Sequence, residues 1–165
     1  MLDGNEICIN ARHHLQTQKT YKPQICKKEG TVGNSSFMEN LIVKIGCKVI
    51  LIHNIDTADG LTNGQLGTLI AVIKTGDGSI AKFIIEFKNE NVGHKNRQNN
   101  PKLAAKYPNG TIIEKMSFTY TLSKKSTAGS SKPTLIQFPI KVAKAITAHK
   151  IQGQTIPQPL KLKLP

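Results

Sequence analysis

Residues 41–87 read LIVKIGCKVILIHNIDTADGLTNGQLGTLIAVIKTGDGSIAKFIIEF, and this stretch decides the fold class. Its apolar runs are short and rich in Val and Ile, which favours β-strands over helices. Turn signals separate the runs: Asp59-Gly60 and Asn63-Gly64 lie in one loop, and TGDGS joins two runs that we expect to pair as an antiparallel hairpin. Gly67 precedes a strand, where the missing side chain permits a bulge or a close backbone approach.

The segments downstream extend the same pattern. Residues 89–110 are polar and basic, and are expected to form a long loop or to carry one short helix around Lys102–Lys106. Residues 111–122 alternate as one strand, and residues 134–138 form another. Residues 41–138 therefore predict a partly open, SH3-like β-barrel. Residues 1–40 are interpreted as a poorly structured connector, although a short strand such as Glu6–Ala11 is compatible with them.

The carboxy-terminal segment, residues 139–165, differs in kind. Pro139 suits a first helical turn and Gly153 suits the position just past a helix end, so PIKVAKAITAHKIQG predicts a helix. Near its end, His149, Lys150 and Gln152 crowd polar donors that suit phosphate oxygens. An ordinary amphipathic helix with solvated polar residues fits the same pattern. The tail PQPLKLKLP cannot continue a helix.

The net charge of +13 is unevenly distributed along the chain. Residues 1–90 carry ten Lys/Arg and nine Asp/Glu, whereas residues 91–165 carry thirteen Lys/Arg and one acid, Glu114. A basic half of this kind is expected of a protein that binds a polyanion, because neutralised phosphates release counterions. Acidic membranes and solubilising tails are alternatives that the count leaves open.

Other classes of protein are disfavoured. The three cysteines form no CxxC pair and no His lies at ligand spacing, so neither a zinc site nor a disulfide framework is indicated. No apolar run reaches the length of a membrane-spanning helix. The amino terminus lacks the features of a secretory signal. We expect no membrane partner, no metal, and an intracellular, nuclear location.

Three segments, in order, resemble Pif-type DNA helicases of superfamily one. Residues 43–72 resemble the start of the family's inserted barrel, with Ile50 in place of the usual Met. QFPIKVAKA resembles the segment that leads into the family's late motif. The carboxy-terminal segment is similar to the late motif itself, Thr-x-His-Lys-x-Gln-Gly-x-Thr. The loop after Asn89 is similar to the Helitron rolling-circle transposon branch. The matching positions are Thr147, His149, Lys150, Gln152, Gly153 and Thr155, and Gly46, Val49, Asn54, Asp56, Gly60, Leu61, Asn63, Gly64 and Gly67.

The resemblance implies a fold and a role. The chain would be a carboxy-terminal fragment comprising an SH3-like barrel insertion and a remnant of the second RecA-like α/β motor domain. Thr147, His149 and Lys150 would contact single-stranded DNA, as would the Asn63-Gly64 turn. Gln152 and Gly153 would lie near the nucleotide cleft, which only the missing domain completes. The parent would be an ATP-dependent 5′–3′ helicase in repair, recombination, telomere maintenance or rolling-circle transposition.

The machinery of phosphoryl transfer is missing from the sequence. It contains no Gly-x-x-x-x-Gly-Lys-Ser/Thr phosphate loop, no Asp-Glu pair for Mg²⁺ and no arginine finger after the late motif. We expect no ATPase activity from this chain alone, and ATP and Mg²⁺ only in the intact parent. Two alternatives stay open: a freestanding nucleic-acid-binding β-barrel module, and a peptide-binding module. The sequence does not determine the oligomeric state.

Overall fold

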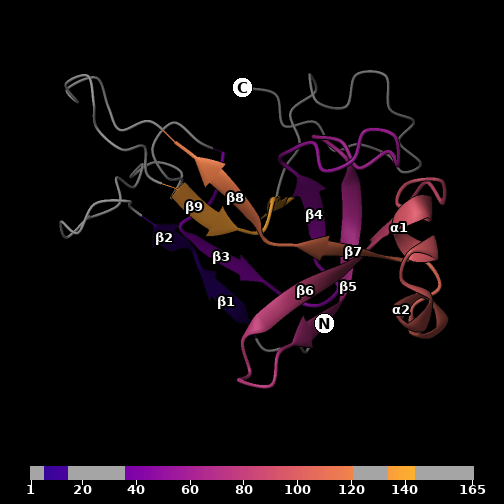
Figure 1. Cartoon of the computed structure of the whole chain (residues 1–165), viewed down its shortest axis with the longest axis horizontal. Helices are drawn as coiled ribbons and strands as arrows, with labels where there is room; N and C mark the ends of the chain where they lie inside the picture. The colour runs from indigo at the N-terminus through magenta and orange to yellow at the C-terminus, as the bar shows by residue number, and fades with distance from the viewer. Residues whose placement is uncertain (1–5, 15–35, 121–133, 144–165) are drawn as a thin grey trace, which may run out of the picture.

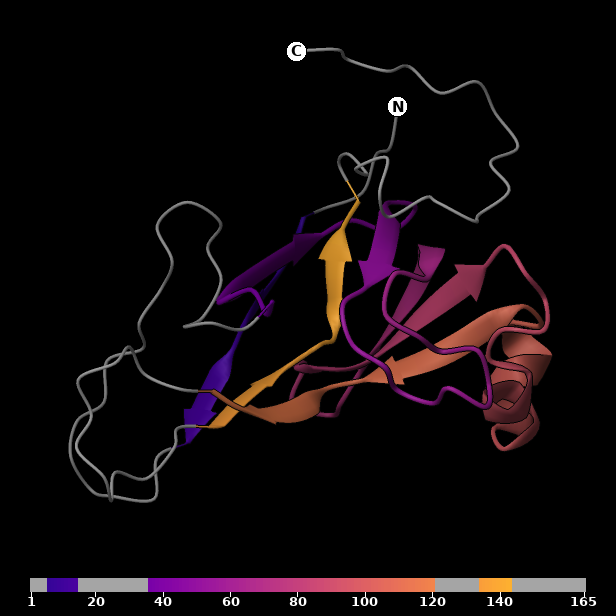
Figure 2. The ribbon, with the colours of Figure 1, turned by 90° about the horizontal axis from the view of Figure 1, so that it is seen from above.

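The computed structural model describes residues 6–14, 36–120 and 134–143. They form antiparallel strands in three sheets, with two short helices at one side (Figures 1 and 2). The elements, in chain order, are β1 (Ile7–Asn10), β2 (Arg12–His14), β3 (Asn40–Val43), β4 (Lys48–Leu51), β5 (Leu66–Lys74), β6 (Ile80–Phe87), α1 (His94–Gln98), α2 (Pro101–Lys106), β7 (Gly110–Glu114), β8 (Met116–Thr119), β9 (Thr134–Gln137) and β10 (Ile140–Val142).

The β5–β6 hairpin is the centre of the largest sheet, whose strand order is β10-β4-β5-β6-β7. Both faces of β5 bury side chains: Leu69 belongs with Ile85 to the main core, whereas Ala71, beyond a pairing irregularity, belongs to a separate apolar cluster with Ile84. The turn closes where the Thr75 amide donates to the Ser79 carbonyl at 2.8 Å, with Gly78 at φ +82°. The predicted hairpin and its tight turn are confirmed.

Gly67 brings two backbones close together. A Cβ at this position would lie 2.5 Å from Ile85 Cγ2 and 3.0 Å from the Glu86 carbonyl oxygen, so any larger residue would push β5 away from β6. The close approach predicted at Gly67 is therefore confirmed. The irregularity in pairing lies slightly further on, between Leu69 and Ala71.

The two helices cover the edge strand β7. Asn96 of α1 acts as a substitute for a neighbouring strand: its Nδ2 donates to the Ile112 carbonyl at 3.1 Å, and its Oδ1 accepts from the Ile112 amide at 2.9 Å. These bonds satisfy backbone groups that a bare edge would expose. The predicted helix around Lys102–Lys106 is confirmed as α2. The sequence did not indicate α1, because it has no buried residue and hence no apolar periodicity.

The two smaller sheets, β1-β3 and β2-β9-β8, are joined to the largest one by a buried amide. β9 leads through Phe138 and Pro139 into β10, which pairs with β4. At this joint Gln137, 1% exposed, donates from Nε2 to the carbonyls of Ile9 and Met38, both at 3.2 Å. Its Oε1 accepts from the Phe138 amide at 2.9 Å. One side chain thus ties β1 and the start of β3 to the β9–β10 crossing.

The core lies between the hairpin and the β1-β3 sheet. Phe83 and Phe138 are fully buried there and stack with ring centroids 4.0 Å apart. A second apolar cluster gathers near β8 and β9, where Phe37 stacks on Phe118 at 3.7 Å. The mainly β fold with few helices agrees with the predicted fold class. In the part of the chain that the structure describes, no helix is long and apolar enough to span a membrane.

The amino-terminal segment corrects one prediction. Residues 1–40 were predicted to be a poorly structured connector, but residues 6–14 are structured, because β1 pairs with β3 and β2 pairs with β9. The short strand considered at Glu6–Ala11 is present as β1. The sequence did not indicate that β1 belongs to the fold, because its partner strand is distant in the chain and Ile9 is its only buried residue.

The start of the carboxy-terminal segment corrects a second prediction. A helix beginning at Pro139 is wrong, since Ile140–Val142 form β10 against β4, with Ile140 buried opposite Leu51. A β-branched residue at each end of this tripeptide suits a strand, and β4 offered an open edge. The predicted single strand over residues 111–122 also divides, at Lys115, into β7 and β8 of different sheets.

Candidate nucleic-acid interface

The Asn63-Gly64 turn lies between β4 and β5 and is open to solvent. Asn63 is exposed, and a Cβ at Gly64 would meet no atom within 4 Å. Gly64 adopts φ +96°, a conformation that favours glycine. The turn is held from beneath: the Gly64 amide donates to the Leu51 carbonyl at 2.8 Å, and the Asn63 amide donates to Asn54 Oδ1 at 2.7 Å. A fixed backbone with open space above it can accept a ligand.

The loop before this turn is folded on itself. Oδ1 of Asp56 accepts from the amides of Ala58 and Asp59 at 3.0 and 3.2 Å, an Asx turn. Asp56 also bridges to Leu61, whose side chain is 1% exposed and belongs to the main core. The loop is therefore anchored at Leu61, and the tip at Asn63 is carried on a rigid base.

Asp59 connects this loop to α1. Its carboxylate is 6% exposed and accepts from the amides of Lys95 at 2.8 Å and Asn96 at 2.9 Å. Its carbonyl accepts from the Gly93 amide at 2.8 Å. The carboxylate thus caps the amino terminus of a helix in another part of the chain, where free N–H groups favour a negative charge. Sequence reasoning missed this residue because the cap is not adjacent to its helix.

The arginine of the basic loop serves the structure. Nη1 of Arg97 donates to the Val92 carbonyl at 2.8 Å and to Thr111 Oγ1 at 3.0 Å, and Nη2 donates to the Glu90 carbonyl. Because its donors are used on the protein, Arg97 is not a free phosphate ligand. Arg12 is the other arginine of the chain and lies far from it in sequence.

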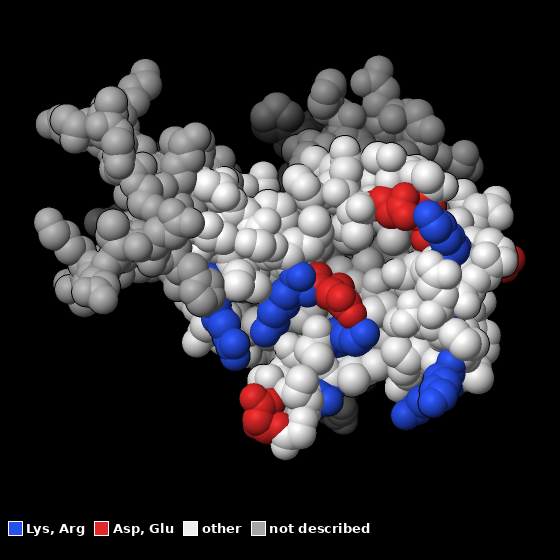
Figure 3. Space-filling model, in the orientation of Figure 1, with Lys and Arg blue, Asp and Glu red and all other residues white. Residues whose placement is uncertain are grey.

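The cations of the described residues do not form one uniform patch on the face in Figure 3, where blue and red groups adjoin. Lys82 pairs with Glu114 at 2.6 Å and Lys95 with Asp56 at 3.8 Å. Six of the thirteen cations of the basic half are described: Lys95, Arg97, Lys102, Lys106, Lys115 and Lys141.

The predicted late-motif residues are outside the described residues. These are Thr147, His149 and Lys150 for the nucleic acid and Gln152 and Gly153 for the nucleotide cleft. Among the predicted contacts, only the Asn63-Gly64 turn is described. No group of three or more potential metal ligands occurs within residues 6–14, 36–120 and 134–143.

Part of the chain matches a known protein-family model. Residues 35–72, which include β3, β4 and the Asn63-Gly64 turn, match the family model of the DNA helicase Pif1 2B domain. No curated protein has a sequence that matches this chain.

Solved structures of Pif1 helicases share the fold. The Candida albicans Pif1 helicase is 20% identical with a TM-score of 0.57, covering 93% of this chain and 32% of that one. Bacteroides Pif1 bound to ssDNA is 18% identical with a TM-score of 0.53, covering 92% and 27%. A structure of two Pif1 helicases coordinating on forked dsDNA is 17% identical with a TM-score of 0.52, covering 92% and 25%.

The similarity to these solved structures concerns the fold, and it covers only part of each of them. This chain spans from a quarter to about a third of the length of these structures. The family model and the solved structures agree with each other, since both are Pif1 helicases. The chain therefore has the fold of a Pif1-type helicase region that includes the 2B domain.

Proposed function

We propose that this chain is a carboxy-terminal portion of a Pif1-type DNA helicase and that it contributes grip on single-stranded DNA. The observation that carries the proposal is the fold likeness, which extends over more than nine-tenths of the chain and includes a Pif1 bound to ssDNA. The match of residues 35–72 to the 2B domain supports it independently.

The parent protein is proposed to be an ATP-dependent helicase that moves 5′ to 3′ in the nucleus. Its Helitron-like loop after Asn89 favours rolling-circle transposition, beside repair, recombination and telomere maintenance. ATP and Mg²⁺ would be held by parts of the parent that carry a phosphate loop, because none occurs in this sequence. The contribution of this chain is therefore binding, not hydrolysis.

Two features of the chain suit it to hold a strand. The Asn63-Gly64 turn presents backbone and amide groups on a fixed base, and groups of this kind bind phosphate and sugar without reading sequence. The late motif adds His149 and Lys150 from the basic half. We therefore propose that Thr147, His149 and Lys150, with the turn, contact the strand, and that Gln152 and Gly153 face the nucleotide in the parent.

A second candidate is a freestanding nucleic-acid-binding β-barrel module. The observation that favours it is the closed core of the described residues, in which every buried side-chain nitrogen and oxygen has a hydrogen-bond partner. In this candidate, the binding of nucleic acid does not depend on the late-motif residues.

The test is fluorescence anisotropy of a labelled single-stranded oligonucleotide, titrated over a series of salt concentrations. His149→Ala/Lys150→Ala is expected to weaken binding and to reduce the slope of log K against log salt by about 0.7, one phosphate contact. Lys163→Ala removes the same formal charge from the tail and is the matched control. Equal losses in both variants would favour the freestanding module, and absence of binding at low salt would refute both candidates.

A further inference from the structure

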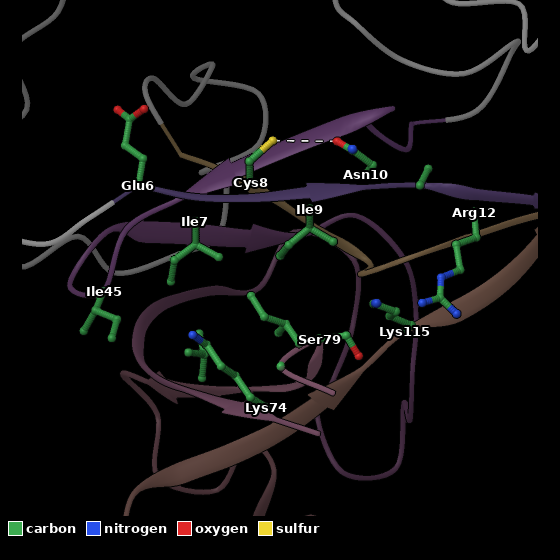
Figure 4. Close-up of a pocket in the computed structure, with 14 residues that line it drawn as sticks. Glu6, Ile7, Cys8, Ile9, Asn10, Arg12, Ile45, Lys74, Ser79 and Lys115 are labelled. Atoms are coloured by element: carbon green, nitrogen blue, oxygen red, sulfur yellow. Dashed lines mark hydrogen bonds between the residues drawn. The ribbon is translucent and has the colours of Figure 1, made fainter. Parts of the chain in front are cut away.

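A groove of about 750 Å³ runs along β1, far from the Asn63-Gly64 turn. Its walls are β1 and the end of the β5–β6 hairpin, and its apolar lining, which we call the floor, includes Ile7, Val72 and Ile80. Figure 4 shows Ile7 and Ile9 pointing from β1 into the groove. The turn precedes Leu66 whereas the groove adjoins Lys74, so the two features are separated by the length of β5, roughly 25 Å for a strand of this size. The groove is thus a separate surface, which we call the β1 groove.

Three cations from separate parts of the chain line the β1 groove. Arg12 comes from β2, Lys74 from the end of β5, and Lys115 from the joint between β7 and β8. In Figure 4, Arg12 and Lys115 lie near each other at one side of the groove, and Lys74 lies at the other side. The fold therefore gathers positive charge here from residues that are distant in sequence.

The acidic groups near the groove are already engaged. Glu6 lines one end and pairs with Lys44 at 3.4 Å. Asp77 in the hairpin turn accepts from the Ser79 amide at 3.0 Å, from the Ser79 hydroxyl at 2.9 Å and from the Thr75 hydroxyl. Within the described residues, by contrast, no ion pair is formed by any of the three groove cations, which are Arg12, Lys74 and Lys115.

The cations also repel one another. Lys115 lies with its amine 5.4 Å from the centre of the Phe138 ring, which keeps it at the groove wall. Partial burial lowers the pKa of Lys115, the positive charge of Arg12 lowers it further, and Asp77 opposes them. Crowded cations without acidic partners cost free energy in the unbound protein, and a bound anion would relieve that cost.

We propose that the β1 groove binds the sugar–phosphate backbone of a single nucleic acid strand, as a contact surface additional to the late motif and the Asn63-Gly64 turn. The inference rests on the proposed function, because it assigns further residues to the same strand. Phosphates would pair with Lys74 at one side and with Arg12 and Lys115 at the other. The sugar and base between them would lie on the apolar floor. Contacts to the backbone carry no sequence information, so binding would be independent of base sequence, and the described residues that line the groove include no aromatic side chain on which a base could stack.

A polymer of alternating charged and less polar groups fits this arrangement better than a compact anion does. The cations stand on both sides of an apolar floor, whereas a single phosphate or carboxylate would need them converged on one point. An acidic peptide could also span the groove, so it is included as a competitor in the test.

The experiment compares two triple variants of the full chain. Arg12→Gln/Lys74→Gln/Lys115→Gln removes the groove cations, and Lys88→Gln/Lys102→Gln/Lys106→Gln removes three exposed lysines elsewhere. Loss of three phosphate contacts should reduce the salt slope by about 2 and weaken binding ten- to a hundredfold at low salt. The control should lose much less. Circular dichroism establishes that both variants are folded, and Lys74→Gln alone, at an exposed strand end, replaces the triple variant if that one unfolds.

Lys74 provides an independent measurement in the protein without any substitution. It is exposed and lines the β1 groove, so a bound strand should slow the acetylation of its amine, followed peptide by peptide in mass spectrometry. Protection of Lys74 by an oligonucleotide, with none at the exposed Lys88, is the expected result.

The outcomes separate the two proposals. Wild-type binding that the groove and control variants weaken equally, with Lys74 unprotected, would overturn the groove proposal and leave the helicase proposal standing. Protection of Lys74 by a polyglutamate peptide but not by the oligonucleotide would also overturn it, in favour of an acidic protein partner. Absence of any oligonucleotide binding would refute the proposed function itself.

Discussion

Removal of the Asp59 carboxylate should unfasten the loop that carries the Asn63-Gly64 turn. The carboxylate is 6% exposed and receives hydrogen bonds from two amides at the start of α1. Asp59→Ala leaves both amides without their acceptor in a buried setting. Loss of a helix cap costs about 1 kcal/mol, and a hydrogen bond to a charged group contributes about 1.5–3 kcal/mol. Because the two values describe partly the same hydrogen bonds, they are not added in full, and we expect Asp59→Ala to lower the free energy of unfolding by about 3 kcal/mol.

Thermal and urea unfolding measure this loss. For a chain of this size, about 3 kcal/mol corresponds to a melting temperature lowered by roughly 6–12 °C. Asp59→Asn keeps one acceptor oxygen and should lose about half as much free energy. Hydrogen exchange should find the amides of Lys95 and Asn96 deprotected. Glu90→Ala, which removes an exposed carboxylate, is the matched control, and an Asp59→Ala melting temperature no lower than that of the control would refute the reasoning.

Three further predictions concern single residues. Gln137→Ala leaves the Ile9 carbonyl and its neighbours without their donor and should cost about 3 kcal/mol in urea unfolding; a loss under 1 kcal/mol would mean that the joint does not depend on this amide. Gly93→Ala, at φ +74° with a Cβ placed 2.2 Å from Thr111 Oγ1, should displace α1 from β7, visible as lost protection of α1 amides. The Thr75 and Ser79 hydrogen bonds lower the pKa of Asp77 from 3.8 to about 2. The ionised Asp77 therefore stabilises the folded protein fully above about pH 4, and this stabilisation is lost as the pH falls through 2. The difference in melting temperature between wild type and Asp77→Asn should shrink over that range of pH.

The hairpin could be predicted from sequence because its information is local. Two Val- and Ile-rich runs flank a turn whose residues, Thr75, Asp77 and Ser79, bond to each other. The close approach at Gly67 was also evident, since a glycine next to a buried strand has few other uses. In both cases neighbouring residues determine the structure.

The parts that could not be predicted depend on partners far along the chain. Asp59 caps a helix 36 residues away, and Gln137 bonds to a carbonyl 128 residues away. The cations of the β1 groove come from β2, from β5 and from Lys115, and no spacing in the sequence relates them. β10 was mistaken for the start of a helix because Pro139 suits a first helical turn and Gly153 suits a helix end, and neither local signal reflects the pairing of Ile140–Val142 with the open edge of β4.

The register of β10 bears on how the candidate surfaces act together. Ile140 lies opposite Leu51 and Val142 lies opposite Val49, so the chain leaves β10 beside the start of β4. The Asn63-Gly64 turn follows the other end of β4. Ile45, just before β4, lines the β1 groove. Ala143, whose amide donates to the Lys48 carbonyl at 2.9 Å, therefore lies at the end of β4 that adjoins the groove, whereas the turn lies at the opposite end.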